Sequence, residues 1–319
     1  MSKRTTGAPG VSVITPLFNC LDVTRAMIES LRASMPRGVT YEIVLVDDGS
    51  TDGTRSWLST LGEPFRVIVN DRNLGFGAAT NAGASAARGR VLALLNNDLI
   101  LRPGWLQPML AVLNSLGPRA GLVGNIQVNA STLGIDHAGI YFNRKCKPEH
   151  DRRDPGIIVP LLFPIREAFA VTGACVVVRR DTWNRLGGFD DAYVNGCEDM
   201  DLCLRAREAG LVNAVALRSR VLHHVSASPG RKLRDEENTR RFILRWRDEV
   251  AALASWRWAI RHSRPFLGED PRDVPDAYEA WRVALFLAHL RRTPPANALA
   301  AMNDVIDREL ARWQEFASE

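Results

Sequence analysis

Runs of apolar residues alternate with amphipathic segments over the first hundred residues of the chain. Four of these runs have the length and the β-branched composition of buried strands, and they begin at Val11, Tyr41, Phe65 and Val91. Between them lie segments with helical spacing of apolar residues, or with an Ala-rich composition up to Ala87. Strands that alternate with helices in this way predict an α/β fold with a Rossmann-like, mostly parallel central sheet flanked by helices.

The pattern becomes less regular in the second half of the chain. A helix after Pro103 and a strand over 121–128 are predicted, but between residues 129 and 164 glycine, proline and charged residues are interleaved. Such a long excursion either shapes a binding site or is mobile. Further strands are predicted over 170–179, 212–217 and 221–223, and a short helix over 181–186.

Domain boundaries follow from shifts in this pattern. From Leu233 onward the chain has helical periodicity, interrupted only by prolines. We therefore predict a first domain over residues 1–230, with halves at about 1–128 and 129–230, and a helical C-terminal extension over 231–319.

Polar residues stand where several predicted strands end. The run from Val91 ends in Asn96-Asn97-Asp98, and the run from Tyr41 ends in Asp47-Asp48. An Asx turn is the structural interpretation of such residues. In open α/β sheets, however, ligands bind outside the carboxyl ends of the strands, so these acids are also candidates for a ligand or metal site.

Two later clusters extend this candidate site. Glu198-Asp199 opens a predicted helix, and His223-His224 ends a predicted strand. A hard divalent cation needs only one or two carboxylates when substrate phosphates supply the other oxygens, which suits Asp98. Histidine is more natural for Mn²⁺ than for Mg²⁺, although a single histidine is usually structural.

Two familiar ligand motifs are absent. The segment that starts at Asp48 resembles a calcium loop, but its twelfth position is Ser59 where a bidentate Glu is required. The segment that starts at Gly75 lacks the third glycine of the dinucleotide fingerprint and follows the third strand. Calcium-loop and NAD-binding functions are therefore disfavoured.

Composition places the chain among ordinary globular proteins. It has 319 residues, 46% of them hydrophobic, which is enough to bury a core. Five cysteines without a Cys-x-x-Cys pair disfavour a disulfide framework or a zinc ribbon. No apolar run is long enough for a transmembrane helix, and the first ten residues lack the apolar region of a secretory signal, so a cytoplasmic protein is expected.

The small positive charge does not by itself define a partner. The formal net charge is +5, and much of the excess falls on basic residues after Gly230. A solvated helix face explains these residues more simply than a membrane or acceptor surface does. The tryptophans of the same region have two interpretations, which are packing between helices and a membrane interface.

Taken together, the motifs resemble those of the inverting family 2 glycosyltransferases with the GT-A fold, particularly bacterial members that build rhamnose-containing and other surface polysaccharides. The resemblance runs in order over residues 11–228, and no motif of it covers the chain from Pro229 onward. It is carried by the segments VSVITPLFN, EIVLVDDGSTDGT, RNLGFGAATNAGASAARG, LLNND, TGACVVVRRDTWNRLGGFDDAY, CEDMDLCLRAREAG and HHVSAS.

The resemblance implies roles for residues in the donor half, about 1–128. Asp48 is expected to bind the nucleoside base, and the backbone around Pro16 to line the base site. Arg72 is expected near the base or diphosphate, as a fixed cation complementary to phosphate. Asn97 and Asp98 are expected to contact the donor, because they match the end of the family's Asp-x-Asp element.

The same resemblance implies a metal and a catalytic base. Asp98 and His223 are expected to hold Mn²⁺ or Mg²⁺, with His224 as the alternative if the register differs by one. Asn96 and Asn97 replace the usual acids of the Asp-x-Asp element, so we expect weak metal binding, with metal independence as the alternative. Asp199 matches the catalytic base, and Glu198 is assigned to acceptor binding, to support of Asp199 or to a donor-sugar hydroxyl.

The expected function is transfer of a sugar from a UDP- or dTDP-sugar to a hydroxyl of a saccharide or lipid-linked saccharide in bacterial surface glycan synthesis. A non-catalytic sugar-nucleotide or polymer-binding subunit of a glycan assembly complex is the alternative. A nucleotidyltransferase is disfavoured, because Pro16-Leu17-Phe18-Asn19 is not a Gly-rich phosphate loop. No nucleic-acid partner is expected, whereas the C-terminal helices can provide peripheral contact with the inner face of the cytoplasmic membrane.

Overall fold

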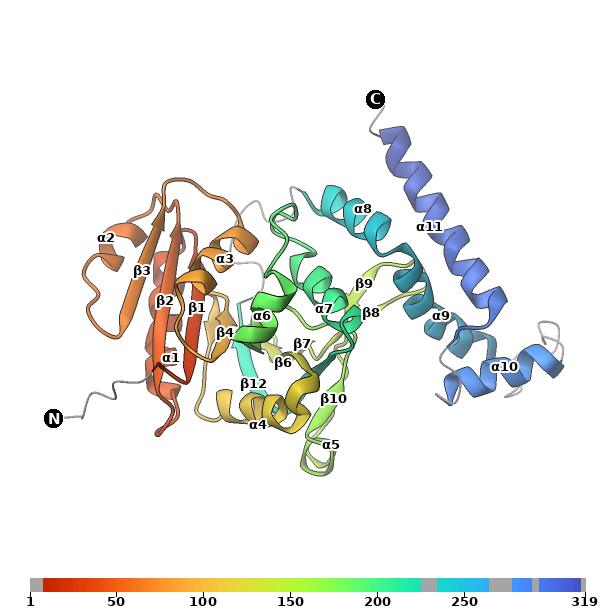
Figure 1. Ribbon diagram of the computed structural model, residues 1–319, viewed down its shortest axis with the longest axis horizontal. Helices are drawn as coiled ribbons and strands as arrows, with labels where there is room; N and C mark the ends of the chain where they lie inside the picture. Colours follow the sequence, from red (N-terminus) through yellow and green to blue (C-terminus); the bar gives the residue numbers. More distant parts are fainter. Residues whose placement is uncertain (1–7, 225–233, 264–276, 289–292, 317–319) are drawn as a thin grey trace. The chain divides into compact units, whose positions relative to one another are not determined.

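The structure, a computed structural model, describes residues 8–224, 234–263, 277–288 and 293–316 (Figure 1). The chain forms two units, each with its own internal packing. The first consists of Met1–Ile140 and His150–Asp235, and the second of Tyr141–Glu149 and Glu236–Glu319.

The first half of the first unit is a parallel β-α arrangement. Strand β1 pairs with β2 and with β4, and β2 pairs with β3, all in parallel. The predicted strands and helices of this half are all present. They are β1 (Val11–Leu17), α1 (Leu21–Ser34), β2 (Tyr41–Asp48), α2 (Thr54–Leu58), β3 (Phe65–Asn70), α3 (Phe76–Ala86) and β4 (Val91–Leu95).

The second half of the sheet has mixed strand directions. Strand β11 (Cys175–Arg179) lies antiparallel between β4 and β6 (Ala120–Asn129), and β6 is parallel to β12 (Val212–His223). Strand β10 (Ile165–Glu167) lies antiparallel at the edge beside β12. Along the sheet the order is β10-β12-β6-β11-β4-β1-β2-β3. The predicted α/β fold with a central sheet flanked by helices is confirmed, whereas the antiparallel strands were not predicted.

Two strand predictions need correction. The strand expected over 170–179 begins only at Cys175, because the backbone of residues 171–174 turns at the sheet edge. The two strands expected over 212–217 and 221–223 are one strand, β12, whose pairing with β6 shifts register between Ala216 and Arg220. Such a bulge interrupts the alternation of apolar and polar residues without ending the strand.

Further elements lie between β4 and β12, and two of them, β8 and β9, fall mostly in the second unit. Residues 129–164, whose pattern predicts no regular element, form short strands and one short helix that lead away from the sheet and back. The elements are β5 (Leu99–Ile100), α4 (Leu106–Leu116), η1 (Gly117–Arg119), β7 (Ile135–His137), β8 (Ile140–Phe142), β9 (Pro148–His150), α5 (Ile158–Leu162), α6 (Arg180–Leu186) and α7 (Glu198–Glu208).

The second unit contains the C-terminal helices and a hairpin from the middle of the chain. The ring of Phe142 stacks on Phe242 with 6.1 Å between centroids, and the Arg257 guanidinium lies 4.0 Å from the centroid of Tyr141. Residues 141–149, which the sequence places in the first domain, therefore pack with these helices. The helices are α8 (Asp235–Arg245), α9 (Arg247–Ser263), α10 (Ala277–Leu287) and α11 (Ala296–Phe316).

Two tryptophans of this unit bear on whether these residues pack between helices or face a membrane. Trp246 and Trp313 are buried, which agrees with packing between helices for these two residues. The side chain of Trp281 lies outside the described part of the structure. Among the described residues, no helix has the length and apolar character needed to cross a bilayer.

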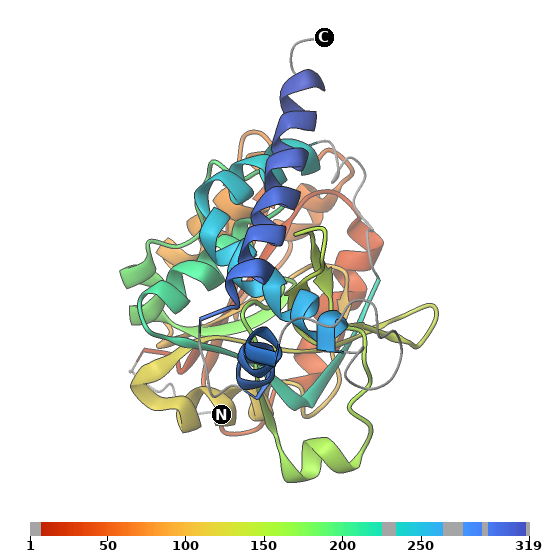
Figure 2. The ribbon, with the colours of Figure 1, turned by 90° about the vertical axis from the view of Figure 1, so that its right-hand side faces the viewer.

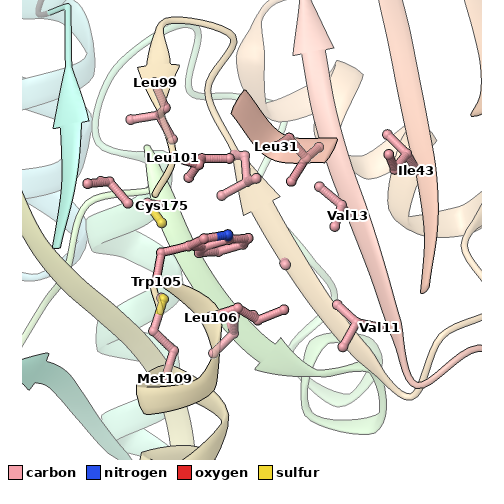
Figure 3. Packing of buried hydrophobic residues seen from close by; sticks show 14 of the residues in the cluster. Val11, Val13, Leu31, Ile43, Leu99, Leu101, Trp105, Leu106, Met109 and Cys175 are labelled. Atoms are coloured by element: carbon pink, nitrogen blue, oxygen red, sulfur yellow. The ribbon is translucent and has the colours of Figure 1, made fainter. Parts of the chain in front are cut away.

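The main core lies on one face of the sheet, under α1 and α4. Trp105 precedes α4 and lies among Leu101, Leu106, Met109 and Cys175 (Figure 3). Helix α3 covers the opposite face of β1 and β2. The closeness of that packing is visible at Gly83, where an added Cβ would lie 2.5 Å from Ile14 Cγ2.

Replacement of Gly83 by alanine tests this contact between α3 and the sheet. The added methyl group overpacks the core at a cost of about 1–3 kcal/mol, of which better helix propensity returns up to about 1 kcal/mol. We expect a net loss in the free energy of unfolding, measured with urea. Gly62→Ala is the matched control, because no atom lies within 4 Å of its added Cβ, and an equal loss in both variants would contradict the packing described.

Candidate functional site at the carboxyl edge of the sheet

Asp48 and Asp98 lie at the same edge of the sheet. Ile14 of β1 pairs with Val44 of β2 on one side and with Leu94 of β4 on the other. Asp48 and Asp98 each follow four residues after these partners, at the carboxyl ends of their parallel strands. The register therefore brings both acids to the edge where α/β proteins bind ligands.

The Asp48 carboxylate organises the loop between β3 and α3. It accepts hydrogen bonds from Asn70 Nδ2 at 2.8 Å, from the backbone N–H of Leu74 at 3.0 Å and from that of Gly75 at 2.9 Å. A carboxylate has about four acceptor positions, so most of its capacity is used within the chain. Asp48 thus fixes the loop that carries Arg72.

Gly49 allows this loop to approach β2. Its φ is +81°, and an added Cβ would lie only 2.6 Å from the carbonyl carbon of Arg72. Arg72 itself is exposed and lies two residues after the end of β3. The backbone of Arg72 is consequently held against the end of β2, while its side chain faces solvent.

The first two strand-to-helix loops are bonded to each other near Pro16. The backbone N–H of Asn19 donates to Ser50 Oγ at 2.8 Å, and Asn19 Oδ1 accepts from the backbone N–H of Thr51 at 2.8 Å. Asn19 and Cys20 both adopt positive φ, which non-glycine residues rarely do. These bonds give the edge beside buried Pro16 a fixed backbone.

Asp98 and His223 face each other across the strand ends. His223 Nε2 lies 3.2 Å from Asp98 Oδ1, and both side chains are buried. His224 is exposed, and its backbone N–H donates to the Asp98 carbonyl at 2.9 Å. The register therefore directs His223, rather than His224, toward Asp98.

The neighbouring asparagines have different environments. Asn97 Nδ2 donates to Thr24 Oγ1 of α1 at 3.0 Å, which ties the strand end to that helix. The backbone N–H of Asn96 donates to the Ala174 carbonyl at 2.9 Å. Of the three side chains of Asn96-Asn97-Asp98, the described structure thus brings only that of Asp98 to a histidine.

The atoms between Asp98 and His223 suit a shared cation. Asp98 Oδ1 and both ring nitrogens of His223 are buried and make no hydrogen bond in the described structure, despite the 3.2 Å separation. Two ligands of a small cation, each about 2.1 Å from it at right angles, lie about 3 Å apart. The described residues contain no cluster of three or more His, Cys, Asp or Glu side chains around an ion position, so these two residues would need additional ligands.

A second group of polar residues, Asp136, His137 and His150, lies near His223, and the first two of them are buried. Asp136 Oδ2 is 3.9 Å from His223 Nδ1 and 3.9 Å from His150 Nδ1. The ring of His150 meets that of His137 edge-on, with 4.7 Å between centroids. Sequence reasoning missed all three residues, because they fall in the irregular region 129–164. The only available indication was an Asp-His pair within an apolar context.

Burial changes the protonation of these histidines. Desolvation holds the pKa of His137 well below its usual value, and nearby His150 and His223 add to this effect. Desolvation also lowers the pKa of His150, although Asp136 and Asp199 oppose the shift. His137 is therefore neutral near neutral pH, and its Nε2 accepts from the backbone N–H of Gly139 at 3.2 Å.

Asp199 lies at the first turn of α7. Its Oδ2 accepts from the backbone N–H of Gly173 at 2.8 Å, and its Oδ1 accepts from that of Met200 at 2.8 Å. A carboxylate at a helix N-terminus is favoured by the helix dipole. The neighbouring Glu198 is buried, and its Oε2 accepts from the backbone N–H of Gly196 at 2.6 Å.

Residues 171–174 form an edge segment that joins these parts. The backbone N–H of Thr172 donates to His137 Nε2 at 3.4 Å, next to the Gly173 bond to Asp199. The Ala174 carbonyl holds the end of β4 through Asn96. The edge segment thus connects the Asp98 strand end, the histidine group and Asp199.

The predicted site residues form two groups at this edge. Asp98 and His223 are in contact, and the edge segment links their surroundings to Asp199. Asp48 and Arg72 belong to the other group, around the β3–α3 loop. Within the described part of the chain, no hydrogen bond or ion pair joins the two groups directly.

Comparison with known proteins identifies the family. Residues 12–182 match the family described as glycosyl transferase family 2. This region is more than half of the chain, so the chain belongs to glycosyl transferase family 2, as its motifs predicted.

Several curated proteins are similar over part of their length. O-antigen biosynthesis protein RfbC of Myxococcus xanthus is 31% identical over 70% of this chain and 18% of that protein. Succinoglycan biosynthesis protein ExoO of Rhizobium meliloti is 39% identical over 38% of this chain and 34% of that protein. N-acetylglucosaminyl-diphospho-decaprenol L-rhamnosyltransferase of Mycobacterium tuberculosis is 27% identical over 64% of this chain and 72% of that protein. The chain spans about a third or less of the length of RfbC and ExoO.

Solved structures share the fold. The crystal structure of GalNAc-T7 with UDP, GalNAc and Mn²⁺ matches with a TM-score of 0.61 and 20% identity, covering 88% of this chain and 55% of that one. The crystal structure of TarS from S. aureus matches with a TM-score of 0.55 and 15% identity, covering 93% of this chain and 55% of that one. The predicted GT-A fold is confirmed.

The buried neutral state of His137 predicts loss of stability in acid. The unfolded chain binds a proton at this residue below about pH 6.5, whereas the folded chain does not until its lowered pKa is reached. The free energy of unfolding should fall by up to about 1.4 kcal/mol per pH unit in that interval for each such histidine, and His150 adds to it with the same sign. Urea unfolding between pH 7.5 and 5.5 measures this slope. His137→Gln should have a shallower slope than the wild type, and equal slopes would contradict the assignment.

Proposed function

We propose that this chain is an inverting, metal-assisted glycosyltransferase that uses a nucleoside-diphosphate sugar. The observation that carries the proposal is the facing pair of Asp98 and His223, whose buried Oδ1 and Nε2 atoms lie 3.2 Å apart without a hydrogen bond. This pair lies at the carboxyl edge of a sheet in a chain of glycosyl transferase family 2. A diphosphate would supply the oxygen ligands that two side chains leave missing.

The donor binds at the group around the β3–α3 loop in this proposal. Asp48 shapes the base site mainly by fixing this loop through the backbone N–H groups of Leu74 and Gly75, with the backbone near Pro16 as the opposite wall. Arg72 is exposed beside it and offers a fixed cation to the diphosphate. Asn97 contributes by holding the end of β4 against α1. The expected donors are UDP- and dTDP-sugars, by resemblance to the family.

Asp98 and His223 would hold Mn²⁺ or Mg²⁺ in this proposal. When bound, the cation would stabilise the negative charge that develops on the departing diphosphate. Asp136 Oδ2 lies 3.9 Å from the other ring nitrogen of His223, beyond hydrogen-bond distance but on the side from which carboxylates orient ligand histidines in metal sites. With Asn96 and Asn97 beside Asp98, the edge carries less negative charge than three acids would give, which favours weak binding.

Asp199 is the proposed general base. Its carboxylate is oriented by the backbone N–H groups of Gly173 and Met200, and its side chain is partly exposed. It would take the proton of an acceptor hydroxyl while that oxygen bonds to the anomeric carbon and the bond to the diphosphate breaks. A single displacement of this kind inverts the anomeric configuration. Glu198 supports the turn before α7, and acceptor or donor-sugar contact remains its alternative role.

The acceptor in this proposal is a hydroxyl of a saccharide or of a lipid-linked saccharide in bacterial surface glycan synthesis. The names of the similar proteins support it, since they include O-antigen biosynthesis and transfer of rhamnose to a diphospho-decaprenol-linked sugar. The sugar and the linkage would be set by side chains of the region 129–164 and around Tyr193.

Asp199→Asn tests catalysis against a binding role. Asparagine retains an oxygen for the Gly173 N–H but cannot accept a proton, so turnover should fall about a hundredfold to ten-thousandfold. Release of nucleoside diphosphate from a panel of nucleotide sugars, with saccharide acceptors, measures turnover. Nucleotide binding, followed by thermal shift, should be retained. Unchanged turnover would contradict the assignment of the base and favour a non-catalytic subunit.

A pair of adjacent histidines tests the metal site. His223→Ala removes the ring that faces Asp98, so affinity for Mn²⁺ in the presence of UDP should fall about tenfold or more. His224→Ala is the matched control, because that residue is exposed, and its affinity should equal that of the wild type. Electron paramagnetic resonance of free Mn²⁺ measures both. Equal affinity in the two variants, or full turnover after exhaustive chelation, would contradict the metal site.

A further inference from the structure

Residues 157–163, the α5 segment, expose a continuous run of large apolar side chains. Ile157, Ile158, Leu161, Leu162 and Phe163 are exposed by 61–81% and Val159 by 45%, whereas Pro160 is buried. More than half of the exposed large apolar side chains of the described residues lie in this one segment. In both views α5 stands out beyond β10 and α4 (Figure 1 and Figure 2).

Scattered apolar side chains on a surface need no explanation, but a contiguous group marks a site of interaction. The α5 segment makes no described hydrogen bond or ion pair with Asp98, His223 or Asp199. Contact with these three residues therefore does not account for its exposed apolar side chains.

Two arginines of β12 hold the α5 segment in place. Arg218 donates from Nε to the Pro160 carbonyl at 2.8 Å and from Nη2 to the Leu161 carbonyl at 2.6 Å. Arg220 forms an ion pair with Asp154, which lies just before the segment, with 3.1 Å between Nη2 and Oδ1. The segment thus has a defined position on β12. Two backbone carbonyls of its short helix accept hydrogen bonds from Arg218 and need no water, as an apolar medium requires.

The composition of the segment indicates the kind of partner. A helix that docks on a protein surface normally presents one apolar face and keeps polar residues on the other. Residues 157–163 include no polar side chain, so every exposed side of the segment is apolar. A surrounding apolar medium satisfies all of these side chains, whereas a single flat surface covers only some of them.

The charge at the base of the segment indicates the same partner. In the described part of the chain, Arg218 has no acidic residue within ion-pair distance, and its guanidinium is fixed beside the segment by the two carbonyl bonds. Arginine buries its stem in apolar surroundings and keeps its charged end at the phosphate level of a bilayer. We propose that the α5 segment inserts into the interfacial region of a membrane containing anionic lipid, with Arg218 at the phosphate groups.

Vesicle flotation of the full chain tests this membrane contact. The wild type should float with vesicles of phosphatidylglycerol and phosphatidylcholine, and less with phosphatidylcholine alone. The double variant Leu161→Ser/Leu162→Ser replaces two exposed side chains that support no core, so it should fold normally. Its partition into the anionic vesicles should fall about tenfold or more.

Leu244→Ser/Ile260→Ser is the matched control, because it makes the same kind of change at exposed apolar residues of α8 and α9. This control should float like the wild type. Flotation of the α5 variant equal to that of the wild type would overturn the proposal. No flotation of the wild type with the anionic vesicles would also overturn it. A dimer in sedimentation velocity that the α5 variant abolishes would then assign the segment to a second copy of this chain.

Discussion

The edge segment, residues 171–174, is the constraint on which the acid-containing part of the site depends. Its backbone holds Asp199 through Gly173, His137 through Thr172 and the end of β4 through Ala174. A Cβ added at Gly173 would lie 3.2 Å from Phe76 Cε1 and 3.4 Å from Asp199 Cβ, so the missing side chain lets α3, α7 and the segment converge. Because these contacts come from the backbone, they depend on the path of the chain more than on the identity of each residue. The segment can follow this path because β11 is antiparallel to β4 and delivers its first residues to the edge where β4 ends.

The sequence is informative where local pattern and topology agree. Parallel strands bring their carboxyl ends to one edge, so the positions of Asp48 and Asp98 follow from the strand pattern alone. The histidine that faces Asp98 could be predicted only to within one residue, because two histidines are adjacent at the end of the predicted strand. Asp136, His137 and His150 could not be predicted, since their proximity depends on short strands without clear periodicity. The same is true of β11, whose direction is set by its partners rather than by its own residues.

Of the two asparagines before Asp98, Asn97 has a side-chain contact that an acid would serve less well, whereas the contact of Asn96 comes from its backbone. Asn97 donates a hydrogen bond to Thr24 from an N–H₂ group, which an ionised carboxylate does not have. Asn96 is held to the edge segment by its backbone. A second carboxylate beside buried Asp98 would also face it as a like charge without a further partner. The low charge of this strand end is therefore compatible with a stable fold when no cation is bound.

The hairpin of residues 141–149 packs with the C-terminal helices, although the chain on both sides of it belongs to the first unit. The chain leaves the first unit at Ile140, gives Tyr141 and Phe142 to contacts with Arg257 and Phe242, and returns at His150 beside Asp136. A chain shortened before α8 would lose these partners and leave two aromatic rings and a buried cysteine, Cys146, without cover. The second unit therefore depends on two separate stretches of the chain, residues 141–149 and the C-terminal helices, to complete its packing.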